Sequence, residues 1–133
     1  MKISDIQGIG PAHAEKLAKV GIRTTEALLK KGASAEDRKE IEKMTGIGNR
    51  PILEWVNMAD LYRIKGVGSQ FSELLRKTGV DTVVELSKRV PKHLYAEMVE
   101  INQNKNLVNR MPTMGQVEDW VKQAKKLPRV VTY

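Results

Sequence analysis

Three short stretches of the chain place two glycines on either side of one apolar residue. They are Gly8-Ile9-Gly10, Gly46-Ile47-Gly48 and Gly66-Val67-Gly68. Glycine permits positive φ angles and lets another molecule approach the backbone closely. Where such a turn leads into a helix, the first N–H groups of that helix lack partners and carry partial positive charge. The three turns are therefore candidate sites for an oxyanion such as a phosphate.

Two other nucleotide-binding motifs fit these glycines poorly. A dinucleotide fingerprint needs a third glycine where the chain has His13, and it needs a preceding strand, which the sequence does not indicate. A Walker loop needs Gly-Lys-Ser or Gly-Lys-Thr, which does not follow the glycine pairs. We therefore exclude a nucleotide-binding α/β fold.

The sequence offers no catalytic or metal-binding constellation. It contains no cysteine, and its two histidines, His13 and His93, lie 80 residues apart. Neighbouring carboxylates such as Glu40 and Glu42 do not share a helical face and indicate solvated surface. His13 is expected to be a solvated side chain, with contact to a phosphate as the second interpretation. We predict a protein that is not an enzyme and that holds no metal.

Composition and charge narrow the class of partner. The chain has 133 residues, of which 41% are hydrophobic and 29% charged, as in a globular protein. No apolar run approaches the roughly 20 residues of a membrane span, and the N-terminus lacks a signal-peptide core. We therefore expect a cytoplasmic protein without a membrane partner. Residues 1–60 hold 10 basic and 9 acidic residues, whereas residues 61–133 hold 13 and 7, so the second half carries most of the net charge of +7. This excess favours a polyanionic partner.

The chain contains an internal repeat. When it is shifted by 58 residues, residues 3–30 align with residues 61–88 with 10 identities in 28 positions, three of them glycines. Trp55 matches Trp120 at a shift of 65, so the second half has about seven extra residues near "NQNKNLVN". We therefore predict two homologous units, 1–60 and 61–133. A fourth copy of the turn, at residues 109–120, has lost its glycine pair.

Helix signals run along nearly the whole chain, and no segment alternates with a period of two. Pro11 suits the first turn of a helix and Gly21 suits its end. Further helix starts are indicated by Thr24 or Thr25, Ser34, Asn49, Thr82 with Glu85, and Thr113 with Gln116. We predict an all-α fold of about ten short helices, with Trp55 and Trp120 in the core.

The repeated turn resembles the helix-hairpin-helix motif. That motif has an apolar residue two before the first glycine, a small residue four after the second glycine, and an apolar one seven after it. The chain matches with Ala14 and Leu17 in the first copy and Ser72 and Leu75 in the third, while the second copy has Ile52 at the small position. Residues 3 to about 127 also resemble an uncharacterised bacterial family of tandem helix-hairpin-helix domains, known only as a domain of unknown function. The resemblance implies two tandem five-helix units that are SAM-domain-like.

The resemblance also implies DNA-binding residues. Backbone N–H groups would hold DNA phosphates at Gly8, Gly10, Gly46, Gly48, Gly66 and Gly68, and at following residues such as Ser69. A basic residue two after the second glycine is present only as Arg50, because the other copies have Ala12 and Gln70. The third turn is the favoured site because Lys65, Arg76 and Lys77 lie near it in the sequence. Some hairpins of this kind hold a monovalent cation by carbonyls, here those of Ile6 and Ile9, Met44 and Ile47, and Ile64 and Val67.

Two functions remain open from the sequence. The first is a non-catalytic module that grips the phosphate backbone of duplex or structured DNA without sequence specificity. The alternative is a protein–protein interaction or scaffold module that reuses the same fold, as the nearly neutral first unit would suit. The glycine pairs could also be tight corners that only pack two helices together.

Overall fold

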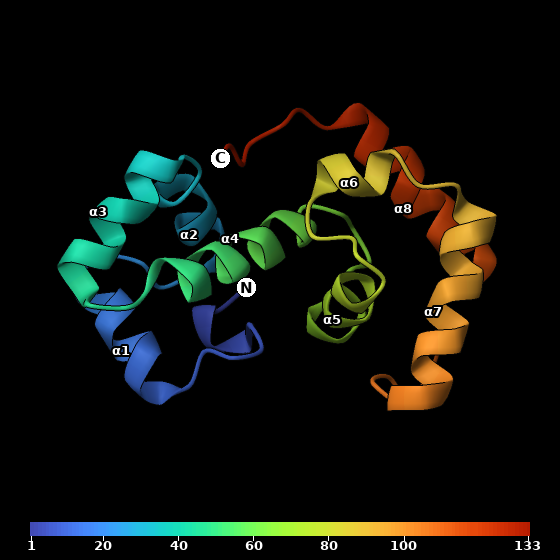
Figure 1. Ribbon diagram of the computed structural model, residues 1–133, viewed down its shortest axis with the longest axis horizontal. Helices are drawn as coiled ribbons and strands as arrows, with labels where there is room; N and C mark the ends of the chain where they lie inside the picture. Colours follow the sequence, from blue (N-terminus) through green and yellow to red (C-terminus); the bar gives the residue numbers. More distant parts are fainter. The chain divides into compact units, whose positions relative to one another are not determined.

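The computed structural model of the chain describes residues 1–133, and all its regular elements are helices (Figure 1). They are η1, a 3-10 helix, at Ile3–Asp5, and the α-helices α1 (Pro11–Lys19), α2 (Thr25–Lys31), α3 (Ala35–Thr45), α4 (Asn49–Leu61), α5 (Ser69–Lys77), α6 (Val83–Ser87), α7 (Pro91–Lys105) and α8 (Met114–Lys126). This confirms the predicted all-α class. The helices are slightly fewer than expected because η1 has no separate counterpart in the second half, where α4 continues to Leu61.

The chain forms two compact units. Unit 1 comprises Met1–Asp60 together with Val130–Tyr133, and unit 2 comprises Leu61–Arg129. The repeat in the sequence would leave residues 130–133 in the second unit, whereas the structure joins them to the first. The repeat could not indicate this, because the contacts of Thr132 with the distant residues Ala33 and Arg38 have no local signal in the sequence.

Arg38 fixes the end of the chain to unit 1. Its buried guanidinium donates hydrogen bonds to the carbonyls of Gly32 at 2.9 Å, Ala33 at 3.0 Å and Thr132 at 2.6 Å. The amide of Thr132 donates in return to the carbonyl of Ala33 at 2.8 Å, and Val131 is buried. Burial lowers the pKa of Arg38 from its ordinary value. The carbonyls around this cation compensate for the water that it loses.

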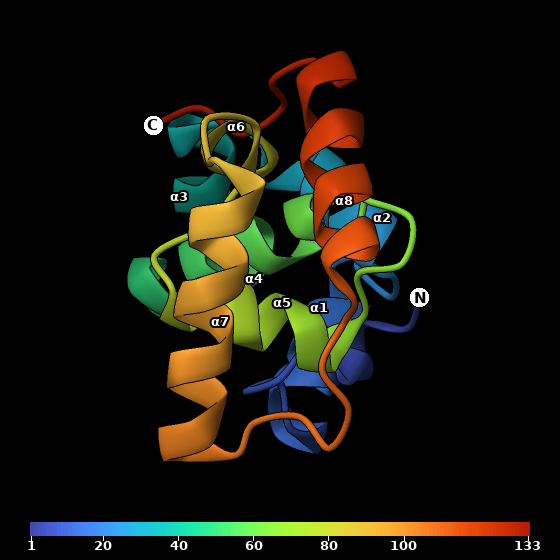
Figure 2. The same cartoon turned by 90° about the vertical axis from the view of Figure 1, so that its right-hand side faces the viewer.

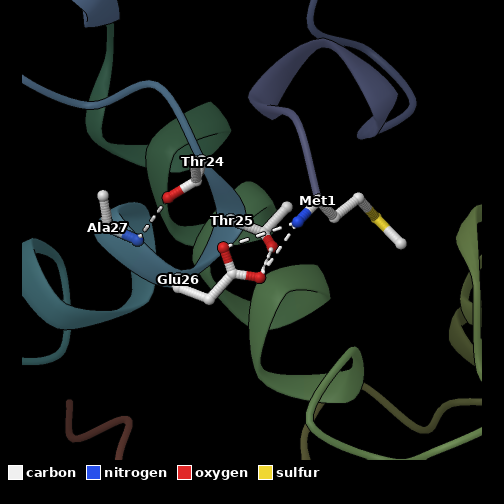
Figure 3. Close-up of polar contacts among 5 residues, drawn as sticks. All are labelled: Met1, Thr24, Thr25, Glu26 and Ala27. Carbon is white, nitrogen blue, oxygen red and sulfur yellow. Dashed lines mark hydrogen bonds and ion pairs between the residues drawn. The ribbon is translucent and has the colours of Figure 1, made fainter.

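Hydroxyl side chains cap the N-termini of several helices, as the sequence predicts. Thr24 Oγ1 accepts from the amide of Ala27 at 3.1 Å and thereby caps α2 (Figure 3). Ser34 Oγ caps α3 by accepting from the amide of Asp37 at 3.1 Å. Each bond satisfies one of the N–H groups that a helix start leaves without a partner.

The first turn of α2 is also tied to the N-terminus (Figure 3). The ammonium of Met1 lies 3.1 Å from Glu26 Oε1, and the hydroxyl of Thr25 donates to the same oxygen at 3.2 Å. The hydrogen bond from this ammonium is the main reason that the pKa of Glu26 lies below its usual value. These contacts hold the first residues of the chain against α2.

In unit 2, the caps follow the predictions only in part. Thr113 and Gln116 form a complete capping box at the start of α8. Thr82 Oγ1 accepts from the amide of Glu85 at 3.3 Å, but the Glu85 carboxylate accepts from the hydroxyl of Thr82 instead of reaching its amide. The second capping box is therefore only half formed. In unit 1, Asn49 was expected to cap α4, but it is the first residue of that helix.

The core of unit 2 lies where α8 packs against α6 and α7, which lie beside it in the view of Figure 2. Apolar residues at helical spacing supply the contacts, as expected for helices with one buried face. The buried set includes Leu74, Leu75, Leu86, Leu94, Met98, Val117, Trp120 and Val121. In this arrangement α8 is the common partner of α6 and α7, and α5 packs against α7.

Replacing Arg38 with leucine tests the role of the buried guanidinium. Arg38→Leu should lower the free energy of unfolding of unit 1 by about 2–4 kcal/mol, because the carbonyls that it serves lose a charged donor. Urea unfolding followed by Trp55 fluorescence in a Trp120→Phe background would measure this. Lys39→Leu removes the same charge from an exposed neighbour and should cost less than about 0.5 kcal/mol. Equal effects of the two substitutions would contradict the account.

Candidate functional site

The glycine turns of the two units share one backbone geometry. Gly8 and Gly66 are left-handed, with φ of 96° and 98°. The next glycines are extended, with φ of −84° at Gly10 and −104° at Gly68. Each of these second glycines is the N-cap of the helix that follows, α1 or α5. The repeat seen in the sequence is thus a repeat of local structure.

The same helices also end alike. Gly21 and Gly79 follow α1 and α5 with φ of 83° and 88°. The amide of Ile22 donates to the carbonyl of Leu17 at 2.9 Å, and Val80 donates in the same way at 3.0 Å to the carbonyl of Leu75. Positive φ is the reason that these positions favour glycine.

A tryptophan packs against the first glycine of each turn. A Cβ atom added at Gly66 would lie 3.0 Å from Nε1 of Trp120, and one added at Gly8 would lie 3.4 Å from Nε1 of Trp55. Both tryptophans are buried, which confirms the core role predicted for them. At Gly8 and Gly66 the fold therefore requires glycine for its positive φ, and at Gly66 the close indole adds a second reason.

An aromatic ring from the first turn of the helix lies against each tryptophan. The rings of Phe71 and Trp120 have centroids 5.3 Å apart, and those of His13 and Trp55 are also 5.3 Å apart. His13 is therefore not the solvated side chain expected from the sequence. Its Nδ1 is buried without a hydrogen-bond partner, because the ring occupies the packing position that Phe71 fills in unit 2.

The second glycine of these turns has no structural role of this kind. Gly10 and Gly68 have ordinary φ angles, and a Cβ added at either would meet no atom within 4 Å. No side chain caps α1 or α5 at its N-cap. By contrast, hydroxyl side chains cap α2, α3, α6 and α8. Serine or threonine stabilises a helix start at least as well as glycine, so stability alone does not explain Gly10 or Gly68.

The uncapped helix start of unit 2 presents more backbone N–H groups than that of unit 1. In α5, Ser69, Gln70 and Phe71 all carry backbone N–H groups at the first turn. In α1, the first residue is Pro11, which has no N–H to donate. Unit 2 therefore offers an anion one more donor at this position.

Gln123 holds the backbone of the third turn in place. Its side-chain carbonyl accepts from the amide of Lys65 at 2.8 Å, and its side-chain NH₂ donates to the Lys65 carbonyl at 3.1 Å and to Asp119 Oδ2 at 2.8 Å. The side chain of Lys65 is exposed beside the turn. Sequence reasoning missed Gln123, although its position one helical turn after Trp120 was a usable signal.

The basic residues predicted around this turn lie at two ends of α5. Lys65 belongs to the turn, but Arg76 and Lys77 end the helix, about 12 Å further along its axis. Arg76 also makes an ion pair with Glu73, at 2.8 Å from Nη2 to Oε1. Lys77 is exposed. The structure thus separates Lys65 from Arg76 and Lys77, and one phosphate at the start of α5 would contact only the first of them.

The second turn joins α3 to α4 in another way. Gly46 ends α3 with φ of 75°, and its amide donates to the carbonyl of Glu42 at 2.8 Å. Gly48 precedes α4, and Arg50 projects from the first turn of that helix with its side chain 91% exposed, 3.7 Å from Glu54. This turn is a helix C-cap as well as a helix start, so it does not repeat the geometry of the other two.

At the fourth copy of the turn, residues 109–120, side chains cap the helix that follows. Thr113 Oγ1 accepts from the amide of Gln116 in the first turn of α8, and the side chain of Gln116 accepts from the amide of Thr113. Loss of the glycine pair therefore goes together with a side-chain cap, which gives an internal partner to one of the first-turn N–H groups that an anion would otherwise contact.

Metal and membrane features are limited. No group of three His, Cys, Asp or Glu side chains is placed to hold a metal ion. The carbonyls of Ile6 and Ile64, predicted as cation ligands, accept hydrogen bonds from Ile9 and Val67 at 3.1 and 3.2 Å, and the cation remains a prediction. None of the helices combines the length and the hydropathy that crossing a bilayer would need.

Comparison with known proteins places the chain in a family. The chain belongs to the family described as domain of unknown function DUF4332, whose model matches residues 7–127. No curated protein and no solved structure matches the sequence.

Two substitutions separate the roles of the paired glycines. Gly66→Ala should lower the free energy of unfolding of unit 2 by about 1–3 kcal/mol, because it strains a left-handed residue and crowds Trp120. Gly68→Ser should change it by less than about 0.5 kcal/mol or stabilise the unit, because serine is a good N-cap. Thermal unfolding followed by circular dichroism measures both. A Gly68→Ser loss as large as that of Gly66→Ala would show that the second glycine is also structural.

Proposed function

We propose that the protein is a non-catalytic helix-hairpin-helix module that binds the phosphate backbone of DNA without sequence specificity. The observation that carries this proposal is the start of α5. There, Gly68 leaves open space above a row of N–H groups that no side chain caps. A phosphate oxygen fits such a site because it accepts from several N–H groups and is attracted by the helix dipole.

The charge of unit 2 supports a polyanionic ligand. Residues 61–129 hold 13 Lys or Arg and 7 Asp or Glu, a net charge of +6 (13 − 7). Lys65 is exposed in the turn three residues before Gly68, and Lys77 is exposed at the other end of α5. A phosphate bound by the turn would place neighbouring phosphates of the same strand within reach of further basic residues. Contacts of this kind hold DNA in register but do not read bases.

Unit 1 supports a second candidate function. It has a hollow of about 390 Å³ that is lined by apolar residues and by charged residues of both signs. The side chain of Met44, on this wall, is 52% exposed. The lining residues are Val20, Ile22, Lys30, Lys31, Asp37, Glu40, Ile41 and Met44. A protein ligand that inserts an apolar side chain would suit this hollow better than DNA would, and Met44→Glu should abolish such binding without affecting DNA.

The N-cap substitution gives the sharpest test of DNA binding. Gly68→Ser should weaken binding of a short duplex by about tenfold or more, because the serine side chain occupies the position of the phosphate and competes for its N–H groups. Fluorescence anisotropy at low salt would measure the affinity. Gly10→Ser is the matched control in unit 1 and should have a smaller effect, because Pro11 already removes a donor there. Failure of the unaltered protein to bind duplex or branched DNA at low salt would refute the proposal.

Lys65 can be tested against the residue that unit 1 carries at the same place. Lys65→Gln reproduces Gln7, its counterpart at the shift of 58. The substitution should reduce the slope of log K against log salt by about one, because one fewer phosphate is neutralised. Lys125→Gln removes the same charge near the end of α8 and serves as the control. An unchanged slope for Lys65→Gln would place the bound phosphate elsewhere.

A further inference from the structure

A hollow opens in unit 2 beside the start of α5. Its volume is about 570 Å³, within the range of roughly 300–1,000 Å³ that is usual for small-molecule sites. Its lining residues are Phe71, Arg110, Met111, Thr113 and Gln116. Phe71 is the third residue of α5, so one wall belongs to the same helical turn that presents the uncapped N–H groups.

The opposite wall comes from a segment that unit 1 lacks. Residues 106–113 connect α7 to α8, whereas the equivalent connection between α3 and α4 is only 46–48. Asn102 fixes this longer segment, since its side chain donates to the carbonyl of Val108 at 3.2 Å and accepts from the amide of Val108 at 2.9 Å. Val108 is buried. The extra residues of the second unit thus form an anchored wall that carries Arg110 and Met111.

The lining groups suit a nucleobase. Aromatic rings and the guanidinium plane of arginine are the groups on which unstacked bases lie, and such stacking tolerates every base. The ring of Phe71 contacts Trp120 at a tilt of 48°, is only half-buried and lines the hollow. The Gln116 carbonyl is occupied by the amide of Thr113, and its side-chain NH₂ is available to a ligand. The lining thus combines apolar groups of Phe71 and Met111 with hydrogen-bonding groups of Arg110 and Gln116, a combination that matches a planar heterocycle.

We propose that this hollow binds the base of an unpaired nucleotide whose phosphate lies on the open start of α5. The inference rests on the proposed DNA binding and names the preferred ligand, which is a duplex with a base outside its stack. One nucleotide would then contact two features of the same helical turn, the N–H groups with its phosphate and Phe71 with its base. The excess positive charge of unit 2 favours this ligand over an apolar peptide.

Three duplexes of equal length test the proposal: a fully paired one, one with a single-base bulge, and one whose bulged nucleotide lacks its base. The bulged duplex should bind at least about fivefold more tightly than the paired duplex, because it gains one stacked base. The abasic bulge should bind like the paired duplex. A fluorescent 2-aminopurine base in the bulge should change its emission when the protein binds.

Two variants locate the base. Arg110→Gln should remove the preference for the bulge while leaving affinity for the paired duplex unchanged. Phe71→Leu should remove the same preference and also lower affinity for the paired duplex, because the ring packs beside the phosphate site. Arg129→Gln should alter neither. Circular dichroism establishes that Phe71→Leu is folded, and exposed Arg110 provides the second variant. Paired and bulged duplexes that bind equally, or a preference that survives both substitutions, would overturn this inference while leaving DNA binding intact. Absence of binding to all three duplexes would instead refute the proposed function itself.

Discussion

The packing of an indole against a left-handed glycine organises each unit. Trp120 lies over Gly66 and Trp55 lies over Gly8, and in both places an aromatic ring from the following helix covers the indole. The indole thereby contacts both the turn and the first turn of the helix that follows it. The structural role of the first glycine of each pair accounts for its residue type, because the left-handed backbone disfavours any other residue there.

The second glycine of each pair, Gly10 or Gly68, has no structural role that requires glycine. Gly68 begins α5 with an ordinary backbone and open space above it, whereas four other helices begin with a hydroxyl cap. A helix start that is left uncapped and unobstructed retains N–H groups that an anion can use. The paired glycines thus combine a structural requirement with access to the backbone. In the fourth copy of the turn, Thr113 stands where the second glycine would be, and its side chain caps the helix.

The sequence predicted the features that depend on local signals. The repeat, the all-α class, the threonine and serine caps and the buried tryptophans follow from spacing within one or two helical turns. It did not predict the partners that meet across long separations. The pairing of Arg38 with Thr132, the support of Lys65 by Gln123 and the packing of the half-buried His13 ring against Trp55 depend on tertiary packing. The sequence also grouped Lys65 with Lys77, which the length of α5 separates.

The most direct test of the account is to follow the backbone amides by NMR while a short duplex is added. If the open start of α5 binds a phosphate, the largest shifts should occur at the amides of Ser69, Gln70 and Phe71, and they should fade as salt is raised. The capped amides at the start of α8 should change little. Shifts concentrated in unit 1 or at the start of α8, with none at the start of α5, would contradict the central claim.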